Sequence, residues 1–117
     1  MRIICMKGLF IELPAFSRWR SQYLDDDGLR QLQAMLLDNP LAGSVIPGTG
    51  GLRKVRFADV RRNKGKRGGL RVIYYWWLGQ RQFWLFTLYD KDEMSDLTPD
   101  QRATLKSLLQ AELEAQK

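Results

Sequence analysis

The segment 82–89 limits the possible folds more than any other part of the sequence, because it has the pattern of a strand with two apolar faces. Its apolar side chains include Phe83, Trp84, Leu85, Phe86 and Leu88. A strand with no polar face lies centrally in a sheet that is covered on both sides. A second apolar segment, 70–77, precedes it across a tight turn near Gly79 and Gln80. We therefore expect the two segments to pair as an antiparallel hairpin.

A third strand is predicted at 52–58, next to this hairpin. Val55 and Phe57 would face the core, while Lys54 and Arg56 would point to the opposite side. The segment 3–13 is also apolar and extended, and it contains Lys7, so it reads as a strand rather than a signal peptide.

Helical patterns surround these strands. Pro14 fits the first turn of one helix, which has Phe16, Trp19, Tyr23 and Leu24 at helical spacing. Residues 25–27 are aspartates that would cap a second helix, whose apolar positions are Leu29, Leu32, Met35 and Leu36. A last helix opens at Thr98, Pro99 and Gln101 with a capping box, and its apolar face consists of Leu105, Leu108 and Leu109.

These elements predict one α+β domain over residues 1–117, with a small antiparallel sheet, two N-terminal helices and one C-terminal helix. The chain has no histidine and a single cysteine, Cys5, which excludes Ser–His and Cys–His catalysis and an internal disulfide. We expect no metal and no cofactor. No apolar run approaches the roughly 20 residues of a membrane helix, so we expect a cytoplasmic protein without membrane contacts.

Positive charge is concentrated in residues 53–71. This segment holds nine of the 19 lysines and arginines but only one of the 13 acidic residues, Asp59. A focused basic patch predicts a polyanionic partner, and the alternative is a solvated loop that only keeps the chain soluble. Glycines at 47–51 lack the spacing of a phosphate-binding loop and precede a strand, so we interpret them as a tight turn.

Three cations of this segment are predicted to share one surface: Lys54, Arg56 and Arg71. RNA cleavage by 2′-hydroxyl attack needs a base, cations that hold the phosphorane charge, and an acid for the leaving oxygen. Arginine forks suit the phosphate, and a lysine among other cations can act as the base when its pKa is lowered. The same residues would equally suit phosphate binding without chemistry.

Three sequence motifs resemble the RelE/ParE toxin superfamily, in particular its HigB-like branch. They are GGLRKVR at 50–56, GKRGGLRVIYY at 65–75 and LYDKDEMSDLT at 88–98. The resemblance implies a RelE-like fold and a toxin of a type II toxin–antitoxin system that cleaves mRNA in the ribosomal A site. It also implies a HigA-like helix-turn-helix antitoxin, through which alone the toxin would reach operator DNA.

The resemblance places Lys54, Arg56 and Arg71 at basic positions of the catalytic site. Two positions depart from the family pattern, because Asp92 replaces an arginine and Thr98 replaces a tyrosine. Lys91 is the cation nearest to the first departure, so Lys54 and Lys91 are the candidates for proton transfer, with Tyr89 a weaker one. Six further cations are expected to bind RNA or the ribosome: Arg53, Arg61, Arg62, Lys64, Lys66 and Arg67.

Two other functions fit the same sequence. One is a non-enzymatic, ParE-like inhibitor of gyrase, although gyrase binding does not require so dense a cation cluster. The other is an RNA- or ribosome-binding module, in which substitution of Lys54 and Arg71 would weaken binding without affecting any cleavage.

Overall fold

The computed structural model describes residues 2–5, 9–57 and 69–116, and their side chains from residue 10 onward. Its strands form one six-stranded sheet in the order β1-β2-β6-β5-β4-β3. The strands are β1 (Arg2–Cys5), β2 (Leu9–Glu12), β3 (Ser44–Val45), β4 (Arg53–Phe57), β5 (Leu70–Trp77) and β6 (Gln82–Asp90). The helices are α1 (Pro14–Tyr23), α2 (Asp26–Asp38) and α3 (Pro99–Ala115), with a short 3-10 turn, η3 (Leu78–Gln80).

The predicted antiparallel core of β4, β5 and β6 is confirmed. β4 pairs with β5 and β5 pairs with β6, both antiparallel, and β6 lies inside the sheet between β2 and β5. Its apolar residues are buried on both faces, as the pattern predicted. The turn between β5 and β6 consists of η3 followed by Arg81, which adopts a left-handed conformation with φ 53°.

The prediction of one strand at 3–13 in an antiparallel sheet needs correction in two respects. This segment contains two strands, β1 and β2, which pair antiparallel, while β2 runs parallel to β6 from Leu9 opposite Gln82 to Glu12 opposite Leu85. The sheet is therefore mixed. Most of the chain separates β2 from β6, so no tight turn imposes an antiparallel direction on this pair.

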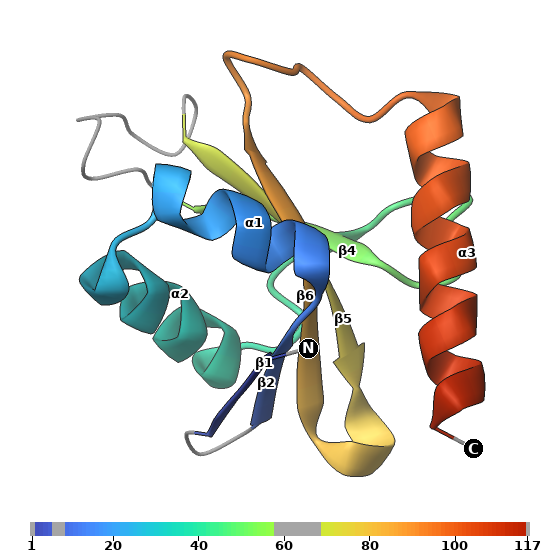
Figure 1. Ribbon diagram of the computed structural model, residues 1–117, viewed down its shortest axis with the longest axis horizontal. Helices are drawn as coiled ribbons and strands as arrows, with labels where there is room; N and C mark the ends of the chain where they lie inside the picture. Colours follow the sequence, from blue (N-terminus) through green and yellow to red (C-terminus); the bar gives the residue numbers. More distant parts are fainter. Residues whose placement is uncertain (1, 6–8, 58–68, 117) are drawn as a thin grey trace.

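The helices cover the two faces of the sheet (Figure 1). α1 and α2 pack on the face that carries Val55, Val72 and Leu85, and α3 packs on the face that carries Ile73 and Trp84. The α+β class and the three predicted helices are thus confirmed.

Capping residues begin the helices as predicted. The Asp25 carboxylate accepts a hydrogen bond from the backbone N–H of Gly28 at 2.7 Å, and Pro14 occupies the first turn of α1. Two residues of these apolar patterns are not buried: Trp19 is 42% exposed and Leu108 is 45% exposed. Both line a second cavity of about 630 Å³ between α1 and α3, where neither helix covers the other.

The glycine-rich segment before β4 forms the predicted turn. Gly48, Gly50 and Gly51 have φ values of 78°, 81° and 122°, in the region that glycine tolerates best. The expected loop at 41–51 also contains the two residues of β3, which pair with Arg53 and Lys54 of β4. Within the described residues, no helix is both long and apolar enough to cross a membrane.

Candidate active site

A cavity of about 670 Å³ lies beside β4, between the end of α2 and the segment that follows β6. All four candidate catalytic residues line it: Lys54, Arg56, Arg71 and Lys91. Two carboxylates, Asp38 and Asp96, also line it. The fold therefore brings together residues that come from β4, from β5 and from the turn after β6.

Arg56 and Arg71 lie directly opposite each other on the paired strands β4 and β5. Arg71 is only 5% exposed, and its Nη1 donates to the carbonyl oxygens of Gly69 at 3.3 Å and Leu70 at 3.4 Å. Like charges directly opposite each other destabilise a sheet. The pairing places two guanidinium groups of the same charge side by side at the cavity.

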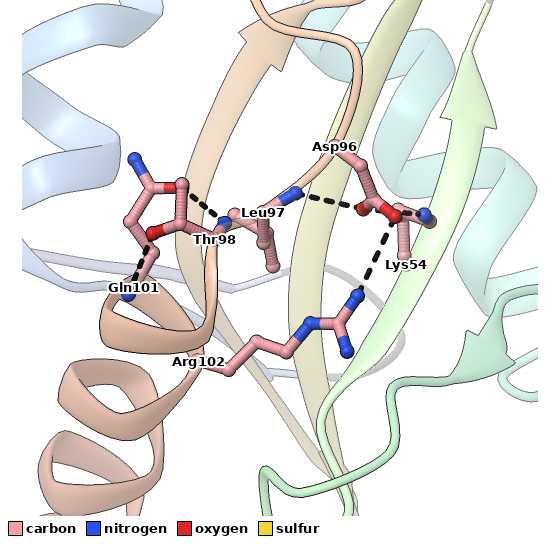
Figure 2. Close-up of polar contacts among 6 residues, drawn as sticks. All are labelled: Lys54, Asp96, Leu97, Thr98, Gln101 and Arg102. Carbon is pink, nitrogen blue, oxygen red and sulfur yellow. Dashed lines mark hydrogen bonds and ion pairs between the residues drawn. The ribbon is translucent and has the colours of Figure 1, made fainter.

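Lys54 on β4 belongs to an ion network with Asp96, in the segment between β6 and α3, and with Arg102 of α3 (Figure 2). Its Nζ lies 3.2 Å from Oδ1 of Asp96, and Nη2 of Arg102 lies 3.4 Å from Oδ2 of the same carboxylate. The backbone N–H of Leu97 donates to Asp96 Oδ1 at 2.7 Å. These hydrogen bonds, from Leu97 first and then from Lys54, lower the pKa of Asp96.

The sequence interpretation missed Asp96 and Arg102. Asp96 falls inside the motif at 88–98, but Lys54 is 42 positions away, so only the folded sheet shows that the two side chains meet. Arg102 carries no comparable sequence signal, because a single arginine in the first turns of a helix is common on solvated surfaces.

Thr98 is the residue that caps α3, as predicted. Its Oγ1 accepts from the backbone N–H of Gln101 at 3.1 Å, and Gln101 Oε1 accepts from the backbone N–H of Thr98 at 2.8 Å. This reciprocal pair fixes where α3 begins, and with it the position of Asp96 two residues earlier (Figure 2).

Tyr89 lies on β6 directly opposite Arg71. It is 7% exposed and lines the second cavity, and its hydroxyl has no hydrogen-bond partner among the described residues. Burial raises the pKa of Tyr89, and the Asp96 carboxylate acts in the same direction. The phenol therefore holds its proton more tightly than a free tyrosine does.

Of the six cations predicted to bind RNA or the ribosome, the structure describes one, Arg53. The guanidinium of Arg53 donates to the carbonyl oxygen of Gly43 at 2.6 Å, so it supports the loop before β3. Five predicted RNA-binding residues lie outside the described residues: Arg61, Arg62, Lys64, Lys66 and Arg67. In the part of the chain that is described, no group of three or more His, Cys, Asp or Glu side chains could hold a metal ion.

No family model matches the sequence. Among solved structures, the chain is similar to a double mutant of E. coli toxin RelE in the free state, with 16% sequence identity and a TM-score of 0.47. The match covers 74% of this chain and 85% of the RelE chain.

Proposed function

We propose that the chain is the toxin of a type II toxin–antitoxin system, in the HigB-like branch of the RelE/ParE superfamily. In this proposal it cleaves mRNA on the ribosome, without a metal ion, and so inhibits translation. The observation that carries the proposal is the convergence of Lys54, Arg56, Arg71 and Lys91 on one cavity, where a phosphodiester would meet four cations.

The cations suit 2′-hydroxyl attack on the adjacent phosphate. Arg71, which is buried and held by backbone carbonyls, and Arg56 opposite it would hold the two charges of the phosphorane. Such preorganised donors stabilise developing charge without having to rearrange during the reaction.

Proton transfer falls to Lys54 and Lys91, which line the cavity, while Tyr89 is a weaker candidate because it lines the second cavity. To act as a base, Lys54 would have to lose its proton and leave the carboxylate of Asp96. Lys54 and Lys91 both stay candidates for the base and for the acid in this proposal.

The proposed partners follow from the basic segment and from the resemblance. Arg53, Arg61, Arg62, Lys64, Lys66 and Arg67 would contact ribosomal RNA and mRNA. A HigA-like helix-turn-helix antitoxin would inhibit the toxin in the cytoplasm, and operator DNA would be bound only through that antitoxin.

The test is cleavage of a defined mRNA by the purified chain, with and without ribosomes. We expect cuts only when ribosomes translate the message. Arg30→Ala is a matched control, because Arg30 lies on α2, pairs with Asp27 and lines neither cavity. Intact transcripts together with a DNA-damage response in cells would instead support gyrase inhibition, and RNA binding without cleavage would support a binding module.

A further inference from the structure

The carboxylate of Asp96 stands between two cations that come from different elements. Lys54 is on β4 and Arg102 is on α3, and each contacts a different oxygen of the carboxylate. The geometry resembles that of a bound anion, because two cationic donors from different elements converge on one negatively charged group (Figure 2). A phosphate group presents the same charge and the same kind of oxygen acceptor to such a pair.

The Asp96 carboxylate uses only part of the hydrogen-bonding capacity of Lys54 and Arg102. Only Nη2 of Arg102 contacts the carboxylate, and Nε of Arg102 is buried without a hydrogen-bond partner among the described residues. A guanidinium has five N–H donors and an ammonium has three, so one carboxylate uses little of their donor capacity. The contact is also replaceable, because the Asp96 side chain is 52% exposed and ion pairs of exposed groups are weak.

We infer that Lys54 and Arg102 form a subsite for one phosphodiester of single-stranded RNA, and that Asp96 occupies this subsite until the RNA displaces it. The inference rests on the proposed function, since it places an RNA strand in the cavity that Lys54 and Asp96 line. Asp96 is thereby an internal competitor that lowers the affinity of the chain for RNA. Arg102 becomes a contact residue that the sequence did not reveal.

The test measures the affinity for a fluorescently labelled, 2′-O-methylated RNA oligonucleotide by anisotropy. This RNA cannot be cut by 2′-hydroxyl attack, so the result does not depend on cleavage activity. Asp96→Asn keeps an oxygen for the Leu97 N–H but removes the charge, and we expect it to bind RNA about two- to fivefold more tightly than the wild type. Arg102→Gln should bind more weakly than the wild type.

Asp26→Asn is the matched control, because it also removes one negative charge and an ion pair, with Arg20 at 3.8 Å, but Asp26 lines neither cavity. It should change the affinity much less than Asp96→Asn does. In a Lys54→Gln/Arg102→Gln background, Asp96→Asn should bring no gain, because no subsite remains to be vacated.

Several results would overturn the inference. They are unchanged or weaker RNA binding by a folded Asp96→Asn, the same gain in the doubly substituted background, or no RNA binding by any variant. If Asp96→Asn does not fold, the amide resonance of Leu97 in the wild type gives a second readout, since its N–H donates to Asp96. RNA binding should shift this resonance, and an unshifted one would contradict the displacement. A chain that binds in this way but cuts no mRNA would refute the proposed function and leave the subsite intact.

Discussion

Replacing Arg71 by alanine should abolish most of the proposed RNA cleavage while leaving the fold intact. Loss of one preorganised donor to a developing negative charge typically costs 10²–10³ in rate. Arg56 lies directly opposite Arg71 and would still hold part of the phosphorane charge, which favours the lower end of this range. We therefore expect a decrease of about 100-fold, which corresponds to about 2.7 kcal/mol of transition-state stabilisation.

The effect on stability should be smaller and should come from two opposing terms. Arg71 is 5% exposed, so alanine leaves a gap in the buried strand, but it also removes a like charge that faces Arg56. Favourable cross-strand pairs are worth roughly 0.2–1 kcal/mol, so we expect relief of this repulsion to be of the same order. For a chain of this size, 1 kcal/mol corresponds to a change in Tm of about 4 °C. A net loss of a few degrees would leave the variant folded at the temperature of the assay.

The assay is single-turnover cleavage of mRNA on programmed ribosomes, with Tm measured for each variant. Arg71→Lys keeps the charge but not the two-pronged hydrogen bonding, so its rate should lie between those of wild type and Arg71→Ala. Arg30→Ala should cleave at the wild-type rate. Full cleavage by a folded Arg71→Ala would refute the role of this residue, and with it the argument that the opposed arginines hold the reacting phosphate.

Three further predictions concern the framework of the site. Thr98→Ala removes the hydroxyl that caps α3 and should lower the free energy of unfolding by about 1 kcal/mol in urea titrations; no loss would refute the capping role. Gly43→Ala places a Cβ 2.8 Å from the carbonyl oxygen of Lys54, so we expect the free energy of unfolding in urea to fall by about 1–3 kcal/mol. Wild-type stability of this variant would show that β4 moves aside without a loss of stability. Burial raises the pKa of Tyr89, so its contribution to stability is present below the ordinary tyrosine pKa of about 10 and is lost as the pH rises above it. Tyr89→Phe should therefore lose less stability than the wild type between pH 9 and 11, and equal losses would contradict the assignment.

The parts of the fold that were predictable depend on short-range patterns. The caps at Asp25 and Thr98 involve groups three residues apart, and a sequence displays such pairs directly. The faces of β4 and β5 follow from strict alternation, which correctly placed Lys54, Arg56 and Arg71 on one side of the sheet.

The parts that were not predictable depend on contacts between distant segments. The ion pair of Lys54 with Asp96 spans 42 positions, and no local rule distinguishes Asp96 from the other aspartates of its motif. The direction of β2 relative to β6 was also not predictable, because the apolar residues of a short strand do not indicate which strand it will pair with. Trp19 and Leu108 have the spacing of core residues, but the space between α1 and α3 stays open beside them.

The parallel pairing of β2 with β6 has a consequence for how the chain folds during synthesis. Leu9 and Gln82 are partners, so more than 70 residues must be made before this pair can form. Closing a loop of that length costs about 4 kcal/mol of chain entropy, whereas β5 and β6 need only a tight turn. β1 and β2 precede the other strands of the sheet in the chain, so they dock onto a sheet whose centre is synthesised much later. Contacts of such long sequence separation slow folding, so the N-terminal strands should complete the sheet only after the hairpin of β5 and β6 has formed.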